Sequence, residues 1–266
     1  MAEDFSKYNG EGTDLRKAQL RMLEILIAVD KICRKHDIPY WLDWGTLLGA
    51  VRHGGFIPWD DDVDISMMKE DYDRFLAIAP NELPEQFALQ NLSTEKYYPH
   101  LFTKIVDKKS KTIDSTCAYS QSKGKYSGLW IDIFPVIRGN VHLRRWLDPL
   151  YGRCYRRVHH LSPLNVSVVI SYILFPFVWL AKQLMCFFNL FCDKNLRMDE
   201  YGTIGNEASC QKYYDDFIPT KELMFEGTLL SVPNNYEKVL ADYYGDYMKL
   251  PSEEHRVWHL TKVDFF

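Results

Sequence analysis

Four aspartates within five residues, running into a strict alternation, constrain this chain more than any other stretch. Asp60, Asp61, Asp62 and Asp64 precede or enter the run Val63–Met67, in which polar and apolar residues alternate. A period of two predicts a β-strand with one face towards a core, so Asp62 and Asp64 project from the same side. Two ionised carboxylates this close repel each other unless a cation lies between them. Oxygen ligands suit a hard ion, and we expect Mg²⁺ or Mn²⁺.

The other two acids receive separate predictions. Asp60 shares the face of Asp62 if the strand begins early, and it then reaches the metal or a bound water. Asp61 is expected to point the other way and to hydrogen-bond within its own loop. The alternative for the whole cluster is a solvated acidic turn without an ion.

A glycine turn upstream predicts an anion site. Gly45-Thr46 follows a short predicted strand, Ile38–Leu42, and leads into a short helix over Leu47–Arg52. A helix that starts at a glycine turn exposes N–H groups where a phosphate can rest. Arg52 and His53 add positive charge, although a loop histidine bonded to the backbone is at least as good an interpretation of His53. An anion site beside a cation site is what phosphoryl or nucleotidyl transfer requires.

Two further charged residues lie in predicted strands. Asp132 is set among bulky apolar residues in Gly128–Pro135, where a buried carboxylate without a partner is costly. It would complete a three-carboxylate metal site, and the alternative is a salt-bridged or capping aspartate. Lys104 shares a face of the strand Leu101–Asp107 with apolar residues, which favours a phosphate ligand and a lysine at a sheet edge equally. The metal site fails if Asp132 lies far away or a basic side chain fills the space among the acids.

Composition excludes several classes of protein. The net charge of −4 lacks the basic footprint of nucleic-acid binding. Six scattered cysteines without a C-x-x-C pair argue against a zinc site and for reduced thiols in the cytosol. The first 14 residues are polar and contain no apolar signal segment. We therefore expect a cytoplasmic protein with one large domain, or a core domain with an insertion.

Apolar periodicity and turn residues predict the other elements. An apolar stripe with a spacing of three and four predicts a covering helix over Leu15–Lys35, capped by Asp14. Tyr243, Tyr244 and Tyr247 are typical of core packing, and the alternative is a platform for a base or a choline-like cation. The same patterns predict helices over Lys69–Ile78 and Asn235–Tyr244 ended by Gly245, a strand over Phe87–Asn91, a polar loop over Ser110–Ser127 and a hairpin turning at Glu226-Gly227.

Residues 142–197 differ in character from the rest. A run of arginines and histidines is followed by Val166–Cys192, which is nearly all apolar and is interrupted by Pro176. The charge-free stretch before Lys182 lasts 17 residues, whereas a membrane span needs about 20. We expect a kinked pair of helices lying in the membrane interface, and the alternative is a buried helical cap. The predicted organisation is a core of 1–141, this insertion of 142–197, and a return to the catalytic domain over 198–266.

The stretch GTLLGAVRHGGFIPWDDDVDISM, with DYDRFL after it, closely resembles the LicD family, which takes in the ribitol-phosphate transferases fukutin and fukutin-related protein. The lead-in DKICRKHDIPYWLDWG, the later WIDIFP and the block FEG…VPNNYEKVLADYYGDYMKLP resemble further parts of that family, about half the chain in all. The resemblance implies an α+β fold with a nucleotidyltransferase-like mixed sheet flanked by helices. It also gives Asp132 its place beside the first acids.

The resemblance further implies transfer of a phospho-substituted alcohol such as phosphocholine. The implied donor is a nucleotide-activated alcohol of the CDP-choline type, and the implied acceptor is a cell-surface glycan or lipid-linked glycan, as in lipopolysaccharide or teichoic acid. A lipid-linked acceptor fits a location at the inner face of the plasma membrane. Two alternatives stay open: a nucleotidyltransferase that moves a nucleoside monophosphate, and a catalytically inactive adaptor at the membrane surface.

Overall fold

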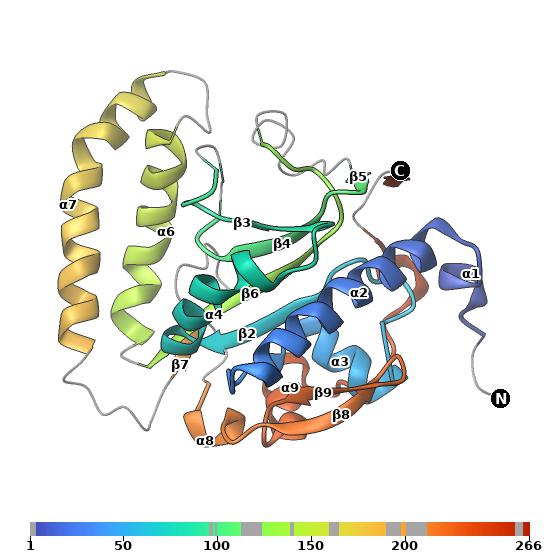
Figure 1. Ribbon diagram of the computed structural model, residues 1–266. Helices are drawn as coiled ribbons and strands as arrows, with labels where there is room; N and C mark the ends of the chain where they lie inside the picture. The colour runs from blue at the N-terminus through green and yellow to red at the C-terminus, as the bar shows by residue number, and fades with distance from the viewer. Residues whose placement is uncertain are drawn as a thin grey trace.

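The computed structural model describes the fold in residues 4–95, 98, 100–112, 124–138, 141–159, 165–189, 198–200, 212–258 and 263–266. Its centre is a sheet in the order β1-β2-β6-β4-β3, with β7 paired to the end of β6 (Figure 1). β2 and β6 are parallel, whereas the other neighbours are antiparallel. The predicted α+β class with a mixed sheet is confirmed. The strands are β1 Trp41–Leu42, β2 Asp64–Met68, β3 Phe87–Gln90, β4 Thr103–Asp107, β6 Trp130–Arg138 and β7 Met198–Glu200.

Two long helices, α2 (Asp14–Lys35) and α4 (Lys69–Glu82), pack on one face of this sheet (Figure 1). Tyr72 of α4 hydrogen-bonds the Thr103 hydroxyl on that face. The apolar stripe of α2 is buried, as its spacing predicts. Its cap is Thr13, whose hydroxyl accepts from the Arg16 N–H, so the prediction of Asp14 as the cap is wrong. On the same face of the sheet, strand residues are fully buried at Ile65, Ile105, Ile131 and Ile133.

A second group of elements borders β1 and the start of β2. Helix α3 (Trp44–His53) contacts helix α9 (Tyr236–Tyr244) and the hairpin of β8 (Lys221–Phe225) and β9 (Thr228–Val232). Glu226 and Gly227 form the hairpin turn at φ 49° and 78°, as predicted. Gly245, at φ 67°, ends α9. The short elements of the described chain are α1 Ser6–Asn9, α8 Tyr214–Phe217 and the 3₁₀ helix η1 Glu253–His255.

The hairpin turn fastens the loop that leads to the acids. The Glu226 carboxylate accepts two hydrogen bonds from Arg16, at 3.1 and 2.7 Å, and one from the Phe56 N–H at 3.2 Å. The Glu226 N–H donates to the Gly54 carbonyl at 3.0 Å. A Cβ on Gly55 would lie 2.3 Å from the Glu226 carboxylate, so a larger residue there would displace this carboxylate from its hydrogen bonds. One turn therefore joins α2, the end of α3 and the segment before β2.

Helices α6 (Val141–Val158) and α7 (Val166–Asn189) form a pair beside the sheet, at the left of Figure 1. Arg138 at the end of β6 is in register with Met198 at the start of β7, so the chain leaves and re-enters the sheet at one place. A single helix passes through Pro176, and the prediction of two kinked helices is wrong. The predicted boundaries at 142 and 197 stay a prediction.

A small sheet pairs β5 (Ser110–Thr112) with β10 (Val263–Phe265). The predicted loop over Ser110–Ser127 therefore starts with a strand, and residues 113–123 lie outside the described part. Cys33 and Cys154 are free and buried, as expected of reduced thiols.

Candidate active site

Three charged residues form a row across neighbouring strands. Asp64 of β2 is in register with Asp132 of β6, and Asp132 is in register with Lys104 of β4. Residues in register on adjacent strands project from the same face about 5 Å apart. This face is opposite the one that α2 and α4 cover, because the intervening residues carry the buried isoleucines. The structure thus brings Asp132 beside Asp64, as the sequence analysis expected.

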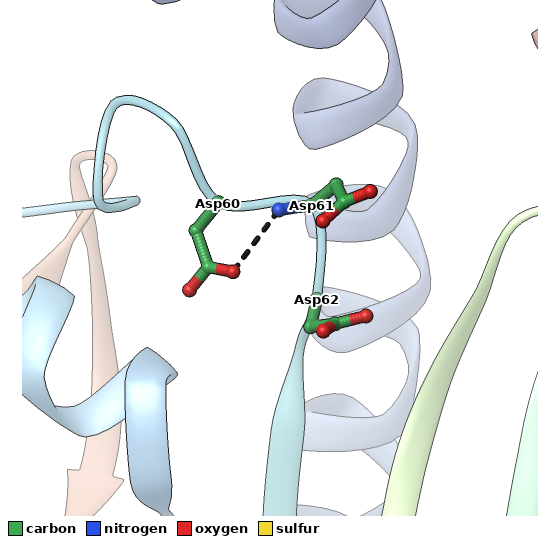
Figure 2. Close-up of side chains that lie close together, drawn as sticks. All are labelled: Asp60, Asp61 and Asp62. Atoms are coloured by element: carbon green, nitrogen blue, oxygen red, sulfur yellow. Dashed lines mark hydrogen bonds between the residues drawn. The ribbon is translucent and has the colours of Figure 1, made fainter. Parts of the chain in front are cut away.

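Asp60, Asp61 and Asp62 lie in the loop before β2, as Figure 2 shows. One carboxylate oxygen of each lies within 4.8 Å of the others. The Asp61 N–H donates to Asp60 Oδ1 at 3.1 Å. β2 begins at Asp64, so the alternation does not extend through this loop. The expected pairing of Asp60 with Asp62 on one face, with Asp61 on the other, is not observed: Asp61 and Asp62 point to one side in Figure 2 and Asp60 points to the other. The Asp61 side chain is buried.

The acids of the loop and the row influence one another. Burial, followed by the charges of Asp60, Asp61 and Asp132, raises the pKa of Asp62 to about 7. Burial and the charges of Asp62 and Asp132 raise the pKa of Asp64 well above its ordinary value. The Lys104 ammonium acts in the opposite direction on Asp62 and does not cancel the shift. Negative charge is therefore crowded at this end of β2, and a bound cation would relieve it.

Lys104, at the β4 end of the row, pairs with the Asp132 carboxylate. Its Nζ lies 3.4 Å from Asp132 Oδ1 and 3.8 Å from the ring centroid of Trp130, and 12% of its side chain is exposed. β4 lies between β6 and β3, so the interpretation of Lys104 as a sheet-edge lysine is wrong. Lys104 approaches Asp132 from β4, whereas Asp64 flanks Asp132 from β2. The ammonium pairs with Asp132, and its charge also acts on Asp62.

The start of α3 is surrounded by carboxylates. The Asp43 carboxylate caps the helix by accepting from the Trp44 N–H at 3.0 Å. The Thr46 hydroxyl accepts from the Asp64 N–H at 2.8 Å, which ties α3 to the first residue of β2. A Cβ on Gly45 would lie 2.8 Å from Asp60 Oδ2, so glycine allows the acid loop to approach the helix. Gly45 and Thr46 thus border the acids, and their contact with a phosphate stays a prediction.

Arg52 and His53 sit at the other end of α3 and contact different partners. Arg52 donates to His53 Nε2 at 3.0 Å and to the Tyr247 carbonyl at 3.0 Å. The His53 ring packs edge-on against Phe5 and Trp59. Burial and the Arg52 charge lower the pKa of His53 to about 4, so the imidazole is neutral at pH 7. These contacts hold the end of α3, and a phosphate-binding role for either residue stays a prediction.

A buried group centred on Asp43 was not predicted from the sequence. Asp43 Oδ2 accepts from Lys212 Nζ at 3.1 Å and from the Ser66 hydroxyl at 2.7 Å, and Oδ1 accepts from the Tyr243 hydroxyl at 3.0 Å. The Tyr243 ring stacks on Trp44 with centroids 4.5 Å apart, and Lys212 Nζ lies 4.8 Å from the Trp44 ring. Trp44 has φ 45°, a conformation uncommon outside glycine. The only signal in the sequence was the position of Asp43 one residue before the helix.

The residues of the acid loop and row suit a hard divalent cation. The five aspartates of the loop and the row offer carboxylate oxygens, the ligands that Mg²⁺ and Mn²⁺ prefer, and Lys104 stands beside them with a positive charge. Burial is the largest cause of the raised pKa values of Asp62 and Asp64, and repulsion by the neighbouring carboxylates, which such an ion would neutralise, adds to it.

Comparison with known proteins identifies relatives over most of the chain. The family model described as LicD/FKTN/FKRP, nucleotidyltransferase domain, matches residues 37–167. Lipopolysaccharide cholinephosphotransferase LicD of Haemophilus influenzae is 31% identical over 261 residues, covering 92% of this chain and 95% of that protein. Mouse ribitol 5-phosphate transferase FKRP is 59% identical over 72 residues, covering 27% of this chain and 15% of that protein. Mouse ribitol-5-phosphate transferase FKTN is 38% identical over 66 residues, covering 24% and 14%.

These matches, with the mixed sheet and its acids, define the class of protein. The chain is an enzyme of the phosphotransferase class. It belongs to the LicD family.

Proposed function

We propose that this enzyme transfers a phospho-substituted alcohol of the phosphocholine type from a CDP-alcohol to a cell-surface glycan or lipid-linked glycan. The observation that carries the proposal is the 31% identity to a lipopolysaccharide cholinephosphotransferase, which extends over 92% of this chain. The acid loop and the row of Asp64, Asp132 and Lys104 all lie within residues 37–167, the stretch that the family model matches. That model is described as a nucleotidyltransferase domain, which supports a nucleotidyltransferase-like sheet as the scaffold.

In this proposal Mg²⁺ or Mn²⁺ is held by Asp62, Asp64 and Asp132, with Asp60 as a further ligand. The ion supplies neutralisation of the donor's phosphate oxygens when it is bound. Lys104, on the β4 side of Asp132, contacts a donor phosphate and adds a second positive charge.

The remaining steps use groups of the chain and the substrates. Gly45 and Thr46 border the donor at the start of α3, where the backbone N–H groups favour an anion. The acceptor hydroxyl attacks phosphorus in line, and an adjacent carboxylate takes its proton. The new bond joins phosphorus to the acceptor oxygen, and the bond between phosphorus and CMP breaks.

The decisive experiment follows two labels on one donor. CDP-choline labelled separately in the cytidine ring and in the choline is incubated with the enzyme, Mg²⁺ and a glycan acceptor. We expect the choline label on the glycan and the cytidine label in free CMP. Cytidine label on the acceptor would instead establish the rival nucleotidyltransferase reaction. A CDP-ribitol arm distinguishes a ribitol-phosphate donor, because the label then transfers from that donor and not from CDP-choline.

A substitution in the row tests whether these acids carry the reaction. We expect Asp64→Asn to abolish turnover while circular dichroism and the melting temperature stay close to those of the wild type. Asp73→Asn, on the exposed side of α4, is the matched control and should retain activity. Loss of folding in Asp64→Asn would indicate a structural role. A wild-type protein without a saturable Mg²⁺ site would favour the inactive adaptor.

A further inference from the structure

Helix α7 exposes apolar side chains around most of its circumference. Among the described residues, the stretch Val166–Met185 is the one helix long and apolar enough to cross a membrane, yet only 28% of it is buried. A core helix with this composition would be mostly covered. The buried positions form one narrow stripe along α6: Val168, Ser171, Val178, Lys182 and Met185.

The outward face of α7 is apolar, whereas the outward face of a surface helix in water is polar. The buried stripe holds polar groups: the Ser171 hydroxyl donates to the Ser167 carbonyl at 2.7 Å, and Lys182 Nζ lies 4.3 Å from the ring centroid of Tyr151 on α6. Large apolar side chains point outward, with exposed fractions of 69% at Phe177 and 50% at Leu180. Polar groups facing a partner helix and apolar groups facing outward are typical of helices in lipid. Other exposed members are Val166, Val169, Ile170, Ile173, Leu174, Trp179, Leu184, Phe187 and Phe188.

We propose that α7 embeds its outward face in a lipid bilayer and that the α6–α7 pair is the membrane-docking surface of this enzyme. The charge of α6 complements such a surface. Arg153 is exposed and Arg157 is half-buried on the helix that lies beside α7, and the sequence of α6 contains three further arginines. Arginines next to an embedded apolar helix attract anionic head groups.

The partner helix decides between spanning the bilayer and lying in its interface. α6 runs along α7, so a spanning α7 would carry α6 into the hydrocarbon with it. An arginine such as Arg153 is costly at that depth. With the pair lying in the membrane plane, the outer face of α7 enters the acyl region by about 5–10 Å while α6 stays at the level of the head groups. The docking surface is therefore interfacial.

Vesicle binding of the full chain tests the proposal without substrates, so its outcome is independent of the transferase activity. We expect the wild type to sediment with vesicles of phosphatidylglycerol and phosphatidylcholine. Leu180→Glu should lower the partition coefficient about tenfold or more, because an exposed leucine that would enter the acyl region is replaced by a charge. Leu229→Glu on β9 is the control, since Leu229 is also 50% exposed, and it should bind as the wild type does.

Two further measurements decide how the surface works. Arg153→Gln should weaken binding to the anionic vesicles and leave binding to pure phosphatidylcholine vesicles unchanged. Light scattering without lipid tests the other possible occupant, a second copy of the chain. The proposal is overturned if the wild type does not bind vesicles, or if Leu180→Glu binds as well as the wild type. It is also overturned if α7 closes a stable dimer that Leu180→Glu dissociates and that does not bind lipid.

Discussion

At the scale of single residues, Asp62 links the candidate metal site to the pH dependence of stability. Burial and the neighbouring carboxylates raise its pKa from 3.8 to about 7 in the folded protein. The folded state then holds a proton that the unfolded chain has lost, so stability without a cation falls as the pH rises through this window. A divalent cation favours the ionised carboxylate. We expect the melting temperature in EDTA to fall between pH 5 and pH 8, and Mg²⁺ to raise it more at pH 8, by differential scanning calorimetry.

Asp62→Asn provides the matched variant for this measurement. It should flatten the pH profile in EDTA and reduce the Mg²⁺ effect at pH 8, because the amide neither titrates nor repels its neighbours. Asp73→Asn should reproduce the wild-type profile. An equal effect of Mg²⁺ at both pH values would contradict a cation site built from these acids.

Lys104 gives a prediction with two readouts of opposite sign. Its ammonium lies 3.4 Å from Asp132 Oδ1, so Lys104→Met makes the row more negative. We expect Mg²⁺ to bind more tightly to this variant in isothermal titration calorimetry. We also expect kcat/KM for CDP-choline to fall ~10- to 100-fold, because a charge-assisted hydrogen bond to phosphate is lost. Lys104→Arg should recover part of the activity. Tighter Mg²⁺ binding with unchanged kcat/KM would limit Lys104 to balancing the charge of Asp132.

The sequence allowed some of these residues to be predicted and not others. Asp64 was predictable because the strand alternation extends through it, and Asp132 because no basic residue lies near it in sequence. Asp43 depends on Lys212, which is 169 positions away, and no local pattern reports such a pair. The contact of Arg52 with the Tyr247 carbonyl could not be predicted either, because the two residues lie 195 positions apart. Local sequence gives the charge of a side chain, whereas the tertiary fold determines its hydrogen-bond and ion-pair partners.

At the scale of elements, the turn between β8 and β9 fixes the loop that carries the acids. Burial opposes the charge of Glu226, but hydrogen bonds from Arg16 and from the Phe56 N–H lower the pKa of this carboxyl below its ordinary value. Glu226→Gln keeps the shape and weakens these bonds. We expect the free energy of unfolding to fall by about 1–3 kcal/mol in urea titrations, as for a partly buried charged hydrogen bond.

The control for Glu226→Gln is Glu253→Gln. Glu253 also pairs with a basic residue, Lys7, at 2.7 Å, but both side chains are exposed. Exposed pairs contribute little to stability, so we expect no measurable change. Equal effects of the two substitutions would mean that the Glu226 turn does not hold the loop.

Elements with a long apolar period were predictable, whereas short ones were not. Helix α2 matched its predicted range to one residue because its stripe repeats over six turns. Strands β5, β7 and β10 have three residues each, too few for an alternation to stand out. Pro176 misled the prediction for α7, because neighbouring turns accommodate a proline in a helix that is held along one side by α6.

At the scale of the whole molecule, the α6–α7 pair is inserted between two antiparallel strands, β6 and β7. Arg138 faces Met198, Ile137 faces Asp199 and Val136 faces Glu200, so β6 and β7 pair directly up to the points where the chain leaves and returns. The site residues lie on β2, β4 and the opposite end of β6, and in the loop before β2. The proposed active site and the proposed membrane-docking surface therefore belong to different parts of the chain, which the β6–β7 pair connects.

This arrangement predicts that the two parts can be separated. Replacing residues 139–197 with Asn-Gly joins a pair of strand residues already in register, Arg138 and Met198, by a two-residue turn that suits antiparallel strands. We expect the shortened chain to unfold cooperatively and to keep the rise in melting temperature with Mg²⁺, because the acids stay on the remaining sheet. It should no longer sediment with anionic vesicles, since α7 is gone. A shortened chain that folds but has lost the Mg²⁺ effect would show that the helical pair supports the acid site, and one that still binds vesicles would move the docking surface elsewhere.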